Sequence, residues 1–181
     1  MATKTRRAVS MVRLRRMYVD CRHGQLHLAT AFPPSGGFDE RTALLFLHDG
    51  GGTGADFNHC AALLGVDRSV YAPDLPGSGA SDGPTGRVTT ANLTTAVADL
   101  LDQLRLREVD VIACGRGAQV AFELAVARPQ EIRRLAIIGT EQPATPLLQP
   151  LRRLDGDSIA TMRDQAAAMV TRLREFLDQA P

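Results

Sequence analysis

Short apolar segments alternate with segments of helical period along most of this 181-residue sequence. Residues 43–47, 69–73, 109–113 and 134–139 are mostly apolar runs with the length of a buried strand. Residues 89–104 place leucine and valine at intervals of three or four, as an amphipathic helix does. Strands that alternate with helices predict an α/β fold, a mostly parallel sheet with helices on both faces.

Two further β-like runs, residues 17–21 and 25–31, precede this pattern and are joined by a three-residue turn that contains glycine. They predict an antiparallel hairpin at the N-terminal side of the sheet, which brings the expected total to about six strands. Helices are also expected at residues 56–64 and 118–127, the second ending before Pro129.

Composition excludes several classes of protein. Hydrophobic residues make up 44% and charged residues 23%, as in ordinary globular proteins. The net charge of +1 lacks the basic excess of nucleic-acid binders, and no segment approaches the ~20 apolar residues of a membrane span. Three cysteines without metal-ligand spacing indicate neither a metal site nor a disulfide framework. We therefore expect a cytoplasmic protein without cofactor, nucleic-acid partner or membrane contact.

Both ends of the sequence differ from its centre. Residues 1–16 hold six basic side chains and no acid, the composition of a transit peptide but without the apolar core of a secretory signal. We interpret them as a flexible basic tail, or as an over-long start that precedes a true beginning at Met11 or Met17. The predicted core extends over residues 17–140. Residues 141–181 are expected to form a Pro-rich connector and a C-terminal amphipathic helix.

That last helix is expected to begin at Asp157 or Ser158, either of which is a suitable N-cap. Its apolar residues fall three or four positions apart: Ile159, Met162, Ala166, Met169, Leu173 and Phe176. Such a stripe is typical of a helix that covers the core as a lid, and it also suits a contact between two chains.

Three glycine-containing turns follow three of the predicted strands. They are His48-Asp-Gly-Gly51, the turn at residues 74–82, and Cys114-Gly-Arg-Gly117. In this order and spacing, and followed by Ile138-Gly-Thr140, they resemble the α/β-hydrolase fold over residues 17–140. We expect the last two strands of that family to be absent, so residues 134–139 are expected to lie at an edge of the sheet.

The resemblance implies a nucleophile elbow, a sharp strand-to-helix turn of the pattern small-x-nucleophile-x-small. Ala113 and Gly117 match the small positions, and Gly115 stands where the family has Ser, Cys or Asp. Cys114 would be the nucleophile only if the motif were shifted by one residue. That shift would place the large side chains of Ile112 and Arg116 at the two small positions, so we expect Cys114 to be a buried neighbour of the turn. The sequence thus predicts no catalytic residue.

The family's general base is a histidine near the C-terminus, whereas this sequence has no histidine after residue 59. His48 is expected to brace its loop, and Glu141 to be a solvated or capping carboxylate. The polar residues of the turn after residue 73 are expected to bond local backbone amides: Asp74, Ser78, Ser81 and Asp82.

The resemblance implies that the family's oxyanion hole is kept. Its two backbone donors would be the N–H of Arg116 and an N–H of the loop after His48, nearest to Gly50. We therefore expect the ligand-binding residues to be Gly50, Gly51, Gly115 and Arg116. The guanidinium of Arg116 either contacts an anionic ligand, or it covers the elbow or pairs with a surface acid.

These inferences give three hypotheses of function. The first is a hydrolase relative without a nucleophile, which binds a small, partly apolar carbonyl or carboxylate compound as a binding module or as a non-covalent catalyst. The second is a structural or interaction protein, and the third is an ester hydrolase completed by another chain. We also expect a homodimer, formed through the edge strand at residues 134–139 or through the C-terminal helix.

Overall fold

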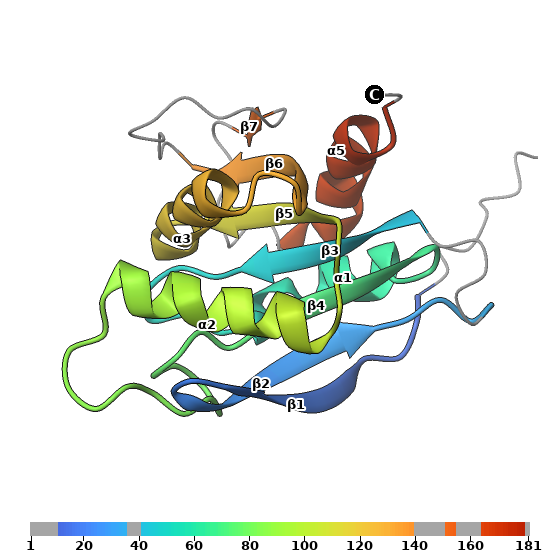
Figure 1. Cartoon of the computed structure of the whole chain (residues 1–181). Coiled ribbons are helices and arrows are strands. Elements are labelled where there is room, and N and C mark those ends of the chain that lie inside the picture. The colour runs from blue at the N-terminus through green and yellow to red at the C-terminus, as the bar shows by residue number, and fades with distance from the viewer. Residues whose placement is uncertain (1–10, 36–40, 140–150, 155–163, 180–181) are drawn as a thin grey trace, which may run out of the picture.

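A seven-stranded mixed sheet forms the centre of the molecule (Figure 1). The structure is a computed structural model that describes residues 11–35, 41–139, 151–154 and 164–179. The strands are β1 (Arg15–Cys21), β2 (Gly24–Ala31), β3 (Arg41–Leu47), β4 (Arg68–Pro73), β5 (Val109–Cys114), β6 (Ile132–Ile138) and β7 (Leu151–Leu154). They lie in the order β1-β2-β4-β3-β5-β6-β7. β2 is antiparallel to both β1 and β4, and every other pair is parallel.

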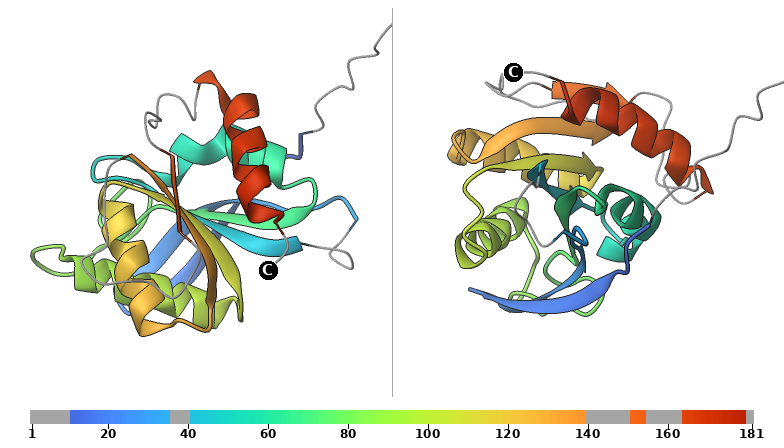
Figure 2. Two further views of the ribbon diagram at one scale, coloured as in Figure 1. Left: turned by 90° about the horizontal axis from the view of Figure 1, so that it is seen from above. Right: turned by 90° about the vertical axis from the view of Figure 1, so that its right-hand side faces the viewer.

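The helices cover both faces of this sheet. They are α1 (Asn58–Leu64), preceded by the 3-10 turn η1 (Gly54–Phe57), α2 (Thr90–Gln103), α3 (Arg116–Ala127) and α5 (Ala166–Leu177). Figure 2 shows α2 and α3 on one face and α1 and α5 on the other. The predicted α/β fold with its N-terminal antiparallel hairpin is confirmed.

Strand β3 shows why the central strands are continuously apolar. Leu45 and Leu47 pack in the core beneath α2 and α3. Leu44 and Phe46 point to the opposite side and pack in a second core beneath α1 and α5. Because successive side chains of a strand face opposite sides of the sheet, a sheet covered on both faces needs apolar residues at every position.

The C-terminal helix contributes to the second core. Met169, Leu173 and Phe176 are buried there, so the predicted apolar stripe covers the sheet. The described helix begins at Ala166, and the expected caps Asp157 and Ser158 lie outside the described residues.

Two expectations about the edges of the fold were wrong. Strand β6 is not an edge strand, because β7 pairs with it in parallel, Leu135 opposite Leu151 and Ile138 opposite Leu154. The sequence of β7 is two leucines around two arginines beside a proline, and it lacks the apolar run by which the other strands were recognised. The expected tail boundary at residue 16 also falls inside β1, and the Val12 N–H already donates to the Ala62 carbonyl at 2.9 Å.

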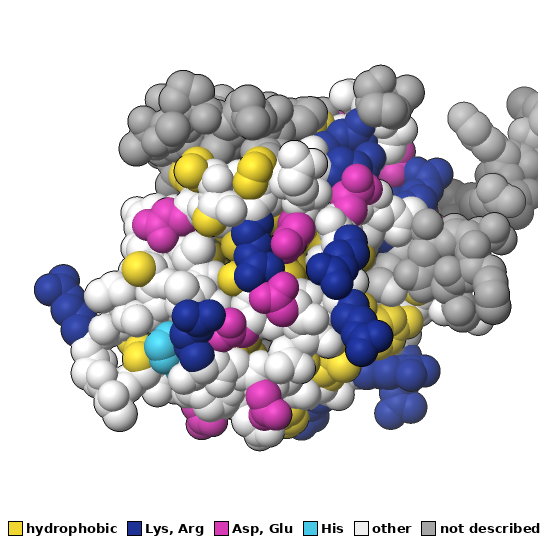
Figure 3. All heavy atoms as spheres, viewed as in Figure 1, with side chains coloured by type: hydrophobic (Ala, Val, Ile, Leu, Met, Phe, Trp, Pro, Cys, Tyr) yellow, Lys and Arg dark blue, Asp and Glu magenta, His cyan; other side chains and the backbone are white. Residues whose placement is uncertain are grey.

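Charged side chains of both signs are interspersed on the face covered by α2 and α3 (Figure 3). Several are paired there, for example Arg22 with Asp99 and Arg128 with Asp102, each at 2.7 Å. Within the described ranges, no helix has the length and apolar character needed to traverse a bilayer.

Candidate functional site

The turn between β5 and α3 has the sharp geometry that the sequence predicts. Gly115 has φ 49° and ψ −122°, a backbone conformation that side chains of L-residues disfavour, and α3 begins at the next residue. Gly117 lies so close to the backbone of Leu47 that a Cβ there would collide with it. Glycine at both positions therefore allows the strand to turn directly into the helix.

Asp49 occupies the place that a side chain at Gly115 would take. A Cβ at Gly115 would collide with Oδ1 of the Asp49 carboxylate. Asp49 follows His48 at the end of β3, the strand beside β5, so both residues lie at the same carboxyl edge of the sheet. The corner from which the family attacks its substrate thus holds a carboxylate from the neighbouring loop.

The two predicted backbone donors meet at one oxygen of this carboxylate. Asp49 Oδ1 accepts the N–H of Gly50 at 2.6 Å and the N–H of Arg116 at 2.7 Å. Both distances are typical of hydrogen bonds to a charged acceptor. The donor pair is therefore formed, and its position is filled by an internal carboxylate.

Beside this corner lies a cavity of about 310 Å³. Its apolar walls include Leu75, Val88 and Leu93, and its polar lining includes the hydroxyl-bearing residues Thr53 and Ser78. The glycine loop 50–52 forms a further part of the lining. A volume of this size suits a small molecule with an apolar body and one or two polar groups.

The Arg116 side chain reaches across this cavity. Its Nη2 donates to the Val88 carbonyl at 2.8 Å, and both residues line the cavity. This contact agrees with the covering role that the sequence suggests, although the partner is a carbonyl and not an acid. Contact between Arg116 and an anionic ligand stays a prediction, as does ligand binding by Gly50, Gly51 and Gly115.

His48 is a structural residue. It is 1% exposed. Its Nε2 accepts the Leu75 N–H at 2.8 Å, and its Nδ1 lies 2.7 Å from the Asp49 carbonyl. Because Nε2 accepts a backbone hydrogen bond, the ring proton resides on Nδ1, which donates to that carbonyl. Both nitrogens are occupied in bracing the loop, as expected.

The carboxylates after β4 bond backbone amides as expected, but mostly in segments that are distant along the chain. Asp74 accepts the N–H groups of Gly54 at 2.8 Å and Ala80 at 2.9 Å, and it lies 3.0 Å from His27 Nδ1. Asp82 accepts the N–H of Gln25 at 2.8 Å. These bonds connect the loops around Gly54 and Ala80 to the N-terminal hairpin.

Two of the three cysteines, Cys60 and Cys114, are buried. The Cys114 side chain is buried in the second core, beneath α1 and α5, with Sγ 3.9 Å from the Leu47 carbonyl oxygen. Burial raises the pKa of the Cys60 thiol to about 12. No three His, Cys, Asp or Glu side chains of the described ranges are grouped to hold a metal ion. Glu141 lies outside those ranges.

The fold and the corner define a protein of the α/β-hydrolase type, with a sheet of this topology, a strand-to-helix elbow and a convergent pair of backbone donors. A model of the alpha/beta hydrolase fold matches residues 42–178. The chain belongs to this family.

Two curated relatives illustrate the similarity. An uncharacterized protein of Mycobacterium tuberculosis is 32% identical over 96 residues, which cover 53% of this chain and 28% of that protein. The 2-hydroxymuconate semialdehyde hydrolase of Pseudomonas putida is 31% identical over 99 residues, which cover 53% of this chain and 35% of the enzyme. The matches thus span about a third of the length of these relatives.

An epoxide hydrolase from Vigna radiata is similar in structure, with a TM-score of 0.65 and 24% identity. The superposition covers 74% of this chain and 41% of the epoxide hydrolase. At this identity the similarity shows the fold alone.

Proposed function

We propose that this chain is a non-hydrolytic member of its family that binds a small, partly apolar carbonyl compound in the cavity beside Gly115. The observation that carries the proposal is the combination of Gly115 at the elbow with the Asp49 carboxylate in the space of the missing side chain. Covalent acyl transfer requires an attacking group at this corner, and glycine supplies none.

The donor pair supports a carbonyl oxygen as the recognised group. An oxygen that replaced Asp49 Oδ1 would receive the N–H groups of Gly50 and Arg116, while its apolar body contacted Leu75, Val88 and Leu93. The relative from Pseudomonas putida is named for a semialdehyde, which also carries a carbonyl group. Stabilisation of an enolate oxygen at the same donors would make the protein a non-covalent catalyst of elimination, isomerisation or cyclisation.

The test combines a binding measurement with a search for a covalent intermediate. We expect a saturable shift of the unfolding temperature with 4-methyl-2-pentanone, and no acetyl adduct or nitrophenolate release with 4-nitrophenyl acetate. Val88→Phe should abolish the thermal shift because it narrows the cavity. The matched control is Val126→Phe on the outer side of α3, where the side chain is 54% exposed.

Each alternative function has its own signature in this test. An acetyl adduct on the protein would contradict the proposal and favour an ester hydrolase completed by another chain. A thermal shift that persists in Val88→Phe would place the ligand elsewhere. The absence of any saturable ligand, including small molecules sought by native mass spectrometry of the purified protein, would favour the structural or interaction role.

A further inference from the structure

Asp49 supplies the only carboxylate among the residues that line the described cavity. Its Oδ1 holds both backbone donors, and the residue is exposed to solvent. Asp49 and Arg116 line the same cavity. Among the contacts of these two described residues there is no ion pair between them, since the Arg116 guanidinium donates to the Val88 carbonyl. The Asp49 carboxylate at the donor pair is therefore not ion-paired with the Arg116 guanidinium.

We propose that Asp49 is the specificity-determining residue of this cavity, which competes with ligand oxygens for the donor pair and selects neutral carbonyl compounds against carboxylates. This inference rests on the proposed function, since it concerns the ligand of the same site. A ligand oxygen reaches Gly50 and Arg116 only when the Asp49 carboxylate leaves them, so every ligand competes with an acceptor that is already in place.

The charge of Asp49 adds a second effect that depends on the ligand. Asp49 directly precedes Gly50 in the chain, so after displacement its carboxylate remains within a few ångströms of the bound oxygen. Like charges at such a distance repel one another even in water. A carboxylate ligand experiences both the competition and this repulsion, whereas a ketone of the same shape experiences only the competition.

The geometry at Gly115 explains why this arrangement is possible. Any side chain at position 115 would collide with the Asp49 carboxylate. Asp49 can therefore occupy the donors only because the nucleophile is replaced by glycine. Asp49 also determines the charge that a ligand encounters at this corner.

The experiment follows the amide resonances of Gly50 and Arg116 in the full-length, ¹⁵N-labelled protein. Isovalerate and 4-methyl-2-pentanone, which share a branched apolar body, are titrated into the wild type and into Asp49→Ala. Asp49→Asn keeps an acceptor oxygen without the charge. Asp20→Ala is the matched control, because it removes an exposed carboxylate whose bond is to the Gln25 side chain.

We expect Asp49→Ala to move both amide protons upfield before any ligand is added, since each loses a short hydrogen bond. It should then strengthen isovalerate binding about tenfold or more and ketone binding about threefold, as removal of a charged competitor predicts. Asp49→Asn should still compete with the ligand for the two N–H groups but should not repel a carboxylate. The increase in affinity over the wild type should therefore be larger for isovalerate than for the ketone in this variant too. Asp20→Ala should change none of these quantities.

The outcomes separate the two proposals. If the amide protons of Gly50 and Arg116 keep their shifts in Asp49→Ala, or if both ligands gain equally, Asp49 is not the specificity determinant, while the ligand cavity stands. If neither ligand binds the wild type or any variant, the proposed function fails and this inference fails with it.

Discussion

Gly115 and Asp49 form an interdependent pair. Gly115 has the positive φ of the elbow, and the absence of its side chain leaves room for the Asp49 carboxylate. Asp49 in turn satisfies the N–H groups of Gly50 and Arg116, which would otherwise face solvent or a ligand. A substitution at either position is therefore expected to change the environment of the other.

Gly115→Ser tests this dependence. We expect no esterase activity, because both nitrogens of His48 are held by backbone groups and the new hydroxyl would meet a carboxylate. Strain at positive φ should cost about 1–3 kcal/mol of folding free energy. Expulsion of Asp49 from its two hydrogen bonds should add roughly 2 kcal/mol. Chemical denaturation of the variant measures the sum.

Gly86→Ser is the matched control for this substitution. Gly86 has φ +99°, and a Cβ there meets no atom within 4 Å, so only the backbone strain is added. In an Asp49→Ala background, Gly115→Ser should cost no more than Gly86→Ser. An equal cost of Gly115→Ser in both backgrounds would show that the two residues are independent, and robust ester turnover would refute the expected loss of chemistry.

Part of this site was predictable from sequence. The pattern around Gly115 and the donors at Gly50 and Arg116 could be placed because each depends on backbone geometry that a motif encodes. Asp49 was missed as the occupant of the donors, because its role depends on the contact between two loops that are 67 positions apart in the chain. The available signal was an acid directly before the donor loop, combined with a glycine at the elbow.

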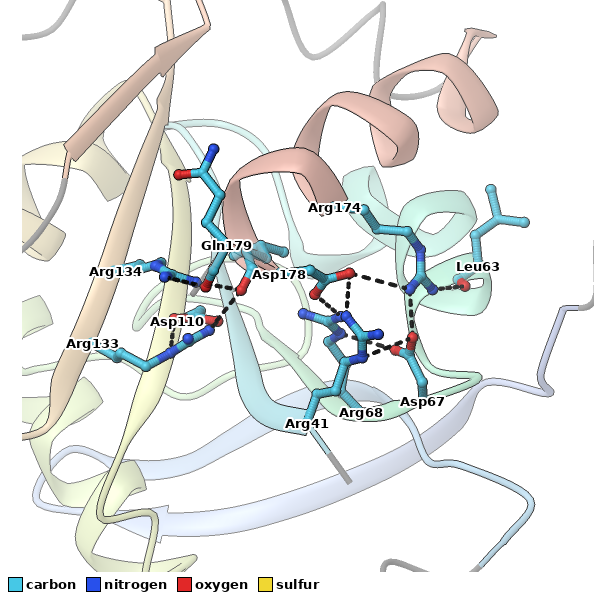
Figure 4. A network of polar contacts seen from close by, with 11 residues as sticks. Arg41, Leu63, Asp67, Arg68, Asp110, Arg133, Arg134, Arg174, Asp178 and Gln179 are labelled. Atoms are coloured by element: carbon cyan, nitrogen blue, oxygen red, sulfur yellow. Dashed lines mark hydrogen bonds and ion pairs between the residues drawn. The ribbon is translucent and has the colours of Figure 1, made fainter. Parts of the chain in front are cut away.

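At the scale of elements, α5 is attached at its C-terminal end by arginines (Figure 4). Arg133 donates to the Leu177 carbonyl at 2.9 Å, and Arg134 Nη2 donates to the Gln179 carbonyl at 2.6 Å. Carbonyls at the end of a helix lack partners within it, and cations there complement the helix dipole. The arginines of β6 therefore act as a C-terminal cap supplied by the sheet.

A second group of ion pairs joins α5 to β3 and β4. The fully buried Arg68 lies 2.6 Å from Asp178 and 3.0 Å from Asp67, and Asp178 also pairs with Arg41 and Asp67 with Arg174. Burial acts to raise the pKa values of Asp67 and Asp178. The hydrogen bonds and charges of the arginines outweigh it and lower both pKa values.

These lowered pKa values predict that acid weakens the attachment of α5. A carboxyl group with a pKa lower in the folded than in the unfolded state stabilises the fold above its unfolded value of about 4. That contribution disappears as the pH falls through the folded value. The pKa of Asp110 in β5 shifts in the opposite direction, because burial raises it despite the contact with Arg133. We therefore expect acid to reduce the stability of α5 before that of the rest of the fold.

Hydrogen exchange measures this effect. Protection factors, corrected for intrinsic exchange, should fall in residues 166–177 between pH 7 and pH 3 before they fall in α3. The control helix α3 contains one acid, Glu123, which accepts a hydrogen bond from the Thr94 hydroxyl and is not part of the arginine pairs at α5. Equal protection of α5 and α3 at both pH values would contradict the prediction.

Elements with strong patterns were predicted well, and β7 was not. The apolar runs located β3 to β6, because strands covered on both faces need apolar residues at most positions, and the glycine-containing turn between two β-like runs located the hairpin of β1 and β2. β7 has four residues, two of them arginines, so neither length nor hydrophobicity distinguished it from a connector. Short edge strands are recognised by the pairing they make with a neighbour, which a single sequence does not reveal.

At the scale of the whole molecule, both surfaces that the sequence suggested for a homodimer are covered within the chain. β7 pairs with the free side of β6, and the apolar face of α5 is buried against the sheet and α1. The opposite edge of the described sheet is β1, where Arg15, Arg16 and Asp20 are exposed. Charged side chains at an edge strand oppose pairing between sheets.

We therefore expect a monomer of 19.5 kDa in sedimentation equilibrium at about 10 µM, a concentration at which a standard-sized specific interface is populated. Tyr18 is a large apolar residue on the β1 edge beside these charges and is 55% exposed, so Tyr18→Glu tests association through that edge. Arg16→Thr removes a charge from the β1 edge and introduces a residue that favours strands, so it should promote self-association. The control is Arg107→Thr, which lies outside the sheet and should have no such effect. A stable dimer of the wild type that Tyr18→Glu leaves intact would show that the chains meet at another surface.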